Sequence, residues 1–247
     1  GMVTTDAVFK DKRIRQAFNY AVDRNRIIRY VLKGQASGPA HHGLVPPSMP
    51  GYETDSVRGY SFDPVKAQAL LAEAGYPRGK GFPEVTLQLN AGGGRNVSVA
   101  EAIQQMLKEH LNVTVKLLQV EFAQHLESID NGQAPFYRLG WIADYPDPET
   151  FLNLYHGKIV PPLGQPSPIN STRFQNARFD ELFEQALSTT DRSKRMRLYR
   201  EAEQIAIDHA PMLLIFNDED YRFIQPYVKG HPHNAMDRTN HHRTRFE

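Results

Sequence analysis

Cysteine is absent from the 247 residues, and tryptophan occurs only once. Without cysteine the chain can form neither disulfides nor thiolate metal sites, and it has no cysteine nucleophile. The net charge is close to zero, with 29 Lys and Arg against 28 Asp and Glu, so the charge does not favour nucleic acid as a partner. No hydrophobic run reaches the roughly 18–20 residues of a membrane-spanning helix, and no signal-peptide core is recognisable.

The remaining composition is that of a globular protein, with 40% hydrophobic and 23% charged residues. Its length corresponds to one large domain or two small ones, at roughly 100–200 residues per domain. Gly1 before Met2 is typical of a residue left after removal of an expression tag. We therefore expect a cut piece of a longer protein, for which the missing export signal carries no weight.

Helical spacing and capping residues predict helices along much of the chain. Asp11 precedes an apolar periodic segment, and Asp63 followed by Pro64 is a strong helix start. Ser98 and Glu101 form a capping box that predicts another start. The helices expected are 11–32 with a break at Asp23, 64–74, 98–111, 122–129, 150–155, 178–188 and 193–209.

Two segments of alternating hydrophobicity, 85–89 and 113–118, flank the helix expected at 98–111 and form a β-α-β unit. Strands joined by such a crossover are parallel, and the connection is right-handed. A third strand is expected at 136–141. The sequence therefore predicts one α/β sheet with all three strands and the helix packed on one face. Further strands are expected at 211–216 and 221–224.

Two polar clusters have both a functional and a structural interpretation. The three glycines and one arginine at 92–95 could hold a phosphate, but they lack P-loop and dinucleotide-binding spacing, and a tight turn before a helix is favoured. Adjacent His41 and His42 point to opposite faces of an extended chain, so no metal site is predicted there. The tail from Pro226 is expected to be loop or partly disordered, and it contains His231, His233, His241 and His242.

An acidic cluster follows the third expected strand. Asp147 and Glu149 suit helix capping and a favourable helix dipole, and their spacing lacks the pattern of a calcium-binding loop. Asp144 differs because it directly follows the strand region and stands beside Trp141 and Tyr145. Asp144 is therefore the candidate functional carboxylate.

The segment Gly140-Trp-Ile-Ala-Asp-Tyr-Pro-Asp-Pro148, followed by Phe151 and Leu152, resembles a motif of the extracytoplasmic oligopeptide- and dipeptide-binding proteins of bacterial ABC importers. The resemblance extends from about residue 8 to residue 230 and covers the second, C-terminal lobe of that family, without its N-terminal lobe or export signal. Other segments similar to the family, in the same order, are 11–24, 34–52, 62–76 and 210–211.

The resemblance implies an α/β fold, namely one lobe of a class II-type periplasmic binding protein with a mixed sheet and flanking helices. It divides the chain into three parts. Residues 1–7 are the tag scar and a lead-in, 8–217 the ligand-binding second lobe, and 218–247 a return segment toward the missing first lobe, ending in a partly disordered tail.

The function implied by the resemblance is that of a substrate-binding component of an importer. Such a component is not an enzyme and needs no cofactor or metal. It binds an oligopeptide or dipeptide between two lobes in the periplasm or another extracytoplasmic space, and it delivers this ligand to a membrane permease. The partners implied are the peptide, the permease and the missing N-terminal lobe, and no nucleic acid.

The resemblance also assigns ligand-binding residues. Asp144 matches the acidic group that pairs with the peptide α-amino group, and Arg138 matches an arginine that in some members meets the peptide carboxylate. Trp141 matches an aromatic residue of the pocket wall, and Tyr145 lies beside it. A buried zwitterionic peptide requires compensation of both end charges, which is consistent with this set. From the residues alone, a surface arginine of a strand is the favoured interpretation of Arg138.

Three alternatives remain open. The same family contains receptors for other solutes, such as nickel chelates and sugars. A hydrolase could use Asp144 and Glu149 as acid and base, although the sequence contains neither a nucleophile motif nor metal-ligand spacing. The lobe could also be a stand-alone interaction protein.

Overall fold

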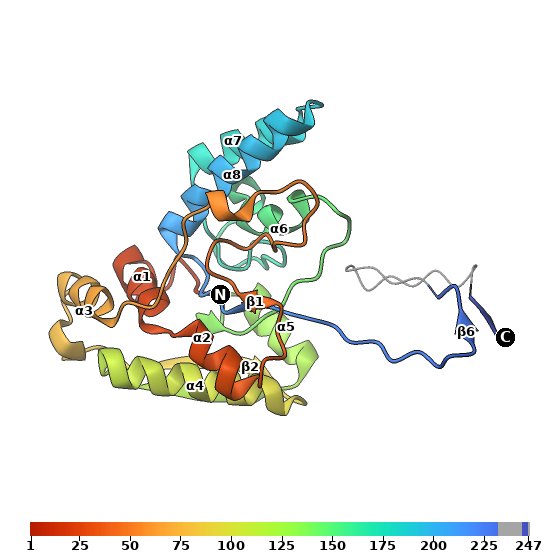
Figure 1. The fold of residues 1–247 in the computed structure, drawn as a ribbon. Coiled ribbons are helices and arrows are strands. Elements are labelled where there is room, and N and C mark those ends of the chain that lie inside the picture. Colours follow the sequence, from red (N-terminus) through yellow and green to blue (C-terminus); the bar gives the residue numbers. More distant parts are fainter. Residues whose placement is uncertain (232–243, 247) are drawn as a thin grey trace.

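The computed structural model describes residues 1–231 and 244–246, and it contains two main hydrophobic cores. We call the first the sheet body; it contains β2 (Val85–Asn90), β3 (Val115–Val120), β4 (Phe136–Tyr137), α1 (Lys12–Ala21), α3 (Pro64–Glu73) and α4 (Gly94–Leu111). We call the second the helical body; it contains α6 (Glu149–Leu152), α7 (Ala177–Leu187), α8 (Arg192–His209) and the loop 44–52. In Figure 1 the helical body lies above the sheet body.

Shorter elements connect and cover these bodies. The helical ones are α2 (Arg24–Arg26), a π-helical turn at Ile27–Val31, α5 (Phe122–Asp130) and 3₁₀ turns at Thr54–Ser56, Pro77–Gly79, Asn153–Tyr155 and Gly157–Ile159. The short strands are β1 (Gly38–Pro39), β5 (Phe216–Asn217), β6 (Val228–Lys229) and β7 (Arg245–Phe246). None of the helices in the described ranges has the length and apolar character needed to cross a bilayer.

Aspartates begin several helices, as predicted. The side chains of Asp11, Asp23 and Asp63 accept hydrogen bonds from backbone amides two or three residues later. The expected start of α4 at Ser98 is wrong, because the helix already begins at Gly94. Gly93 occupies the N-cap position, and no side chain caps this end of the helix. The carbonyl of Gly93 accepts from the amides of residues 96 and 97, so the first turn closes before the capping box.

The predicted three-stranded sheet is confirmed. Its order is β3-β2-β4, and β2 runs parallel to both neighbours, with Val85 opposite Val115 and Leu87 opposite Phe136. The α4 residues that face the core pack with the sheet in the first hydrophobic cluster. The third strand is shorter than expected, because only one further ladder bond, from the Arg138 amide to the Gln88 carbonyl at 2.8 Å, continues it.

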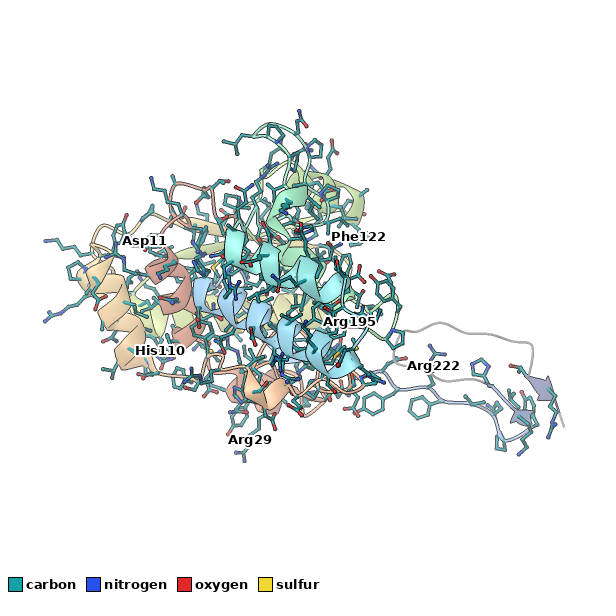
Figure 2. All side chains as sticks on the ribbon, turned by 90° about the horizontal axis from the view of Figure 1, so that it is seen from above. Asp11, Arg29, His110, Phe122, Arg195 and Arg222 are labelled. Carbon is teal, nitrogen blue, oxygen red and sulfur yellow. The ribbon has the colours of Figure 1, made fainter. Side chains whose placement is uncertain are left out.

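The strands expected at 211–216 and 221–224 are wrong. Only β5 pairs, with the equally short β1, while the carbonyls of Met212 and Leu214 accept hydrogen bonds from the side chains of Asn19 and Arg24 rather than from a neighbouring strand. Residues 221–224 have no ladder and lie on a segment that extends away from the body (Figures 1 and 2). His233, His241 and His242 lie outside the described residues.

Two buried arginines connect α1 to the end of α8 and the chain that follows. The Arg15 guanidinium donates to the carbonyls of Phe9 and His209, and Arg24 donates to Leu214 at 2.6 Å and to the Asn19 side chain at 2.9 Å. Burial lowers the pKa of each guanidinium to about 10, so both remain charged at neutral pH. They therefore place two cations in contact with the backbone at the junction of the two bodies.

The first residues of the chain pack against the rest of the fold, and Met2 belongs to the core of the sheet body. Met2 is fully buried, its amide donates to the Pro211 carbonyl at 2.9 Å, and it forms a β-bridge with Phe136. The Thr4 hydroxyl contacts the carbonyl of Arg173 at 2.9 Å. The predicted boundary between residues 1–7 and the lobe at 8–217 stays a prediction. Met2 and Thr4, which precede that boundary, are in contact with residues of the lobe.

Glu203 fixes the loop 44–52 to α8. Glu203 is 1% exposed, and its carboxylate accepts from the amides of Leu44 and Val45, at 2.6 and 3.0 Å, and from the Tyr52 hydroxyl. Burial raises the pKa of Glu203, and the three hydrogen bonds oppose that rise. A side chain at Gly43 would place its Cβ 2.3 Å from the carboxylate, so glycine is required at this close approach.

We expect Glu203→Ala to lower the free energy of unfolding by roughly 3 kcal/mol, because three buried donors lose their acceptor. Glu203→Gln should cost only about 1 kcal/mol, because its carbonyl oxygen can still accept from both amides. Urea unfolding measures both changes. The control is Glu201→Ala on the same helix, where the side chain is half exposed and pairs with Arg197 at 3.8 Å. Equal losses for the two Glu203 variants would contradict the assigned hydrogen bonds.

Candidate functional site

All four predicted site residues lie on one segment, 138–148, which we call the linking segment. It leaves β4 in the sheet body and reaches α6 in the helical body, and it is drawn in green in Figure 1. Arg138 and Trp141 are half-buried, whereas Asp144 and Tyr145 are exposed. The structure thus brings the predicted residues onto one continuous stretch that joins the two bodies.

Hydrogen bonds from the sheet body hold the start of the linking segment. The Arg138 carbonyl accepts from Nε2 of His125 at 2.7 Å, and Nδ1 of His125 lies 3.1 Å from the Gln88 side-chain amide. His125 is fully buried, so these two contacts indicate a neutral ring that donates at Nε2 and accepts at Nδ1. The Arg138 guanidinium donates to the Asn90 side chain at 3.3 Å.

Charged neighbours surround the Arg138 guanidinium. Burial lowers its pKa, the negative charge of Asp218 opposes this, and the positive charge of Arg95 adds to it. Arg95 in turn forms a two-pronged ion pair with Asp218, at 2.8 and 3.0 Å. Two arginines and one carboxylate therefore gather where β2 and β4 end and α4 begins.

The other end of the linking segment is fixed to the helical body. The Asp144 amide donates to the Thr150 hydroxyl at 3.1 Å. Asp147 accepts from the Glu149 amide at 3.0 Å and pairs with Arg195 at 2.9 Å, although the N-cap position of α6 is occupied by Pro148. Arg195, labelled in Figure 2, lies on α8, so this turn is held against that helix.

Aromatic and apolar side chains lie between and beside the two charges. Trp141 packs against the core of the helical body, and its indole N–H is buried without an acceptor among the described residues. Leu139 and Ile142 are 37% and 63% exposed. Burial and the negative charge of neighbouring Glu149 raise the pKa of the Tyr145 hydroxyl. The segment thus presents apolar surface flanked by a cation and an anion.

The spacing of the two charges limits what they can bind. Arg138 and Asp144 are six residues apart on one chain, and six extended residues span at most about 20 Å. A molecule with a carboxylate and an amine within that span could contact both charges and cover the apolar surface between them. Among residues 1–231 and 244–246 no group of three or more metal-ligating side chains is present.

Sequence reasoning did not identify the residues that hold this segment. His125 is a single histidine on a short helix, and Asp218 lies some 70 residues beyond the motif. Neither residue has a local pattern that distinguishes it from a solvent-exposed polar side chain. Only the fold places His125 and Asp218 next to Arg138.

We expect the free energy of unfolding to fall as the pH is lowered from about 7, partly through His125. Burial lowers the pKa of His125, whereas an unfolded histidine titrates near 6.5. The stabilising contribution is therefore complete above about pH 6.5 and is lost as the pH falls through the lowered pKa. His125→Gln keeps an N–H donor for the Arg138 carbonyl but cannot titrate, so its loss between pH 7 and pH 5 should be smaller.

Urea unfolding at pH 7 and pH 5, followed by Trp141 fluorescence, measures this difference. His41, whose pKa burial also lowers, contributes equally in both proteins. Gln124→Ala on the same helix as His125 is the control, because Gln124 is exposed and does not titrate, and this variant should lose as much stability as the unchanged chain. An undiminished loss for His125→Gln would show that His125 is not buried in its neutral form.

Comparison with known proteins finds the same group of proteins that the motif resembles. A family model for bacterial extracellular solute-binding proteins, family 5 Middle, matches residues 1–159. The dipeptide-binding protein of Escherichia coli is 31% identical over 222 residues, which cover 90% of this chain and 40% of that protein. Heme-binding protein A of Haemophilus influenzae is 32% identical over 232 residues, with coverages of 92% and 40%.

Solved structures match the fold over the whole chain. The crystal structure of a periplasmic oligopeptide-binding protein from Borrelia burgdorferi has a TM-score of 0.83 at 27% identity, and the match covers 100% of this chain and 47% of that one. The chain spans about 40% of the length of the curated relatives it matches. Its fold is therefore α/β and corresponds to one lobe of a class II-type periplasmic binding protein.

Proposed function

Because this chain belongs to the bacterial extracellular solute-binding proteins of family 5, we propose that it is the ligand-binding lobe of an ABC importer's receptor and that its ligand is a peptide. The observation that carries the proposal is the linking segment, which is fixed at both ends and presents Arg138 and Asp144 on either side of Trp141. In this proposal the receptor acts outside the cytoplasmic membrane and performs no catalysis.

In the proposed complex, Asp144 pairs with the peptide α-amino group and Arg138 with its carboxylate. Trp141 and Tyr145 line the space between them. A zwitterion that is enclosed by protein requires a partner for each end charge, because an unpaired buried charge is strongly unfavourable. The contacts at His125 and Arg195 support this assignment, since they hold each end of the segment before any ligand arrives.

The proposed site is half of a complete site. Charge pairs on a solvent-exposed face are worth only about 0–1 kcal/mol, and each ordered ligand residue loses roughly 1–2 kcal/mol of backbone entropy. Micromolar affinity requires about 8 kcal/mol. We therefore propose that tight binding requires a first lobe that closes over the ligand, and that the closed form is the one presented to a membrane permease.

A second candidate ligand is a non-peptide solute, because heme-binding protein A matches this chain as well as the dipeptide-binding protein does. A ligand that carries carboxylates and no amine would use Arg138 and would not need Asp144. A hydrolase with Asp144 and Glu149 as acid and base receives no comparable support, since Glu149 is hydrogen-bonded to Tyr145 and begins α6.

We expect Asp144→Asn, in the longer protein that includes the first lobe, to weaken binding of tri- to pentapeptides about tenfold to hundredfold, because a charge-assisted hydrogen bond is worth roughly 1.5–3 kcal/mol. N-acetylated peptides should bind the variant and the unchanged protein equally. Isothermal titration calorimetry provides the dissociation constants. In the isolated lobe, which we expect to bind far more weakly, Trp141 fluorescence reports binding at the site itself.

Asp55→Asn is the matched control, because Asp55 is an exposed aspartate of the same lobe, with a side chain 94% accessible. It should bind free and acetylated peptides like the unchanged protein. Equal weakening of free and acetylated peptides by Asp144→Asn would contradict the role of Asp144. Tight binding of a heme-like ligand with no peptide binding would favour the second candidate.

A further inference from the structure

The ion pair between Arg95 and Asp218 lies beside the proposed ligand carboxylate site. Arg95 is in the first turn of α4, and Asp218 directly follows β5. Both carboxylate oxygens of Asp218 accept from the Arg95 guanidinium, and one also accepts from the Glu219 amide at 2.9 Å. Asp218 therefore uses both of its oxygens in this cluster.

Without Asp218, the charges near the amino end of α4 would be mainly positive. The Arg138 guanidinium donates to the side chain of Asn90 at 3.3 Å, at the end of β2 and a few residues before Arg95, and the positive charge of Arg95 lowers the pKa of Arg138. The amino end of the 18-residue helix α4 adds a partial positive charge. Burial alone would raise the pKa of Asp218, but the hydrogen bonds from Arg95 and the Glu219 amide hold it below its ordinary value, so the carboxylate is ionised at neutral pH.

We propose that Asp218 is a specificity-determining residue that sets the charge of the ligand end bound at Arg138. Its carboxylate neutralises one of the two arginines, so the site retains one positive charge and suits a ligand end with a single carboxylate. Without Asp218 the same place would accept two negative charges. The proposal rests on the proposed function for its ligand, while its electrostatic core concerns this chain alone.

The surroundings of Arg95 allow the charge to change without a change of shape. Apart from Asp218, its guanidinium donates to the Gln35 carbonyl at 2.8 Å and lies 5.1 Å from the centre of the Phe216 ring. The chain just before Asp218 is held independently, because β5 pairs with β1 and the Asn217 carbonyl accepts from the Ser37 amide at 3.0 Å. Removing the carboxylate should therefore leave both arginines in place.

The chain beyond Asp218, residues 219–231, which we call the exit segment, begins next to the ion pair of Arg95 and Asp218. Figure 1 shows that the chain leaves the body beyond β5, and Figure 2 labels Arg222 on that departing stretch. Asp218 thus connects the Arg138 site to the point where the chain departs. A ligand with a second negative charge would compete with Asp218 for Arg95.

Inorganic phosphate is the probe for the test, because it is a small dianion and needs no first lobe. Nuclear magnetic resonance follows the Nε–H signals of Arg95 and Arg138 during a phosphate titration. We expect Asp218→Asn to bind phosphate at least tenfold more tightly than the unchanged chain. Asp218→Glu, which keeps the negative charge, should bind it as weakly as the unchanged chain.

Two controls separate charge from structure. Asp220→Asn removes an exposed aspartate of the same segment, which pairs with Arg222 at 3.4 Å, and it should not change phosphate binding. The amide signals of Gly38 and Asn217 report whether β1 and β5 remain paired. If the asparagine variant loses that pairing, Asp218→Ser provides a second neutral substitution for the same comparison.

The proposal would be overturned if the unchanged chain and a neutral variant, Asp218→Asn or Asp218→Ser, bound phosphate equally while β1 and β5 remained paired in that variant. An equal gain for Asp220→Asn would overturn it too, since the effect would then be one of overall charge. Peptide titrations of the longer protein that includes the first lobe form a separate arm. Failure of peptide binding there contradicts the proposed function, whereas the phosphate result decides the role of Asp218 in either case.

Discussion

The Arg15 guanidinium joins the sheet body to the helical body by donating to a backbone carbonyl at the end of α8, and Arg24 holds the chain that follows. A buried cation requires hydrogen-bond acceptors, and the carbonyl of His209, the last residue of α8, lies at the negative end of that helix dipole. Arg24 adds the carbonyl of Leu214, just before β5. The two acceptors lie at the end of α8 and shortly after it. The contacts of the two arginines therefore set both the position of α8 against α1 and the place where the chain continues toward β5.

That junction determines the geometry of the candidate site. The linking segment begins on the sheet body, where His125 holds the Arg138 carbonyl, and ends on the helical body, where Arg195 holds Asp147. The separation of Arg138 and Asp144 is therefore a property of the two bodies and not of the segment alone.

Local signals in the sequence were sufficient for most of the fold. Aspartate caps and alternating strands predicted the helices and the parallel sheet, because those features depend on neighbouring residues. The start of α4 and the region 211–216 were predicted wrongly, since a glycine carbonyl closed the first turn early and side chains replaced the expected strand partner. The motif identified the linking segment, but His125, Arg195 and Asp218 act on it from distant parts of the chain and left no local pattern.

The buried position of Met2 has a consequence for the order in which the fold can form. Its amide is bonded to Pro211, and it bridges to Phe136, so contacts of the first few residues close loops of more than a hundred residues. Chains rich in such distant contacts fold slowly, because loop closure comes before the contacts that stabilise it. Synthesis must therefore pass residue 136 before Met2 can bridge to its strand partner, and residue 211 before the Met2 amide finds its acceptor.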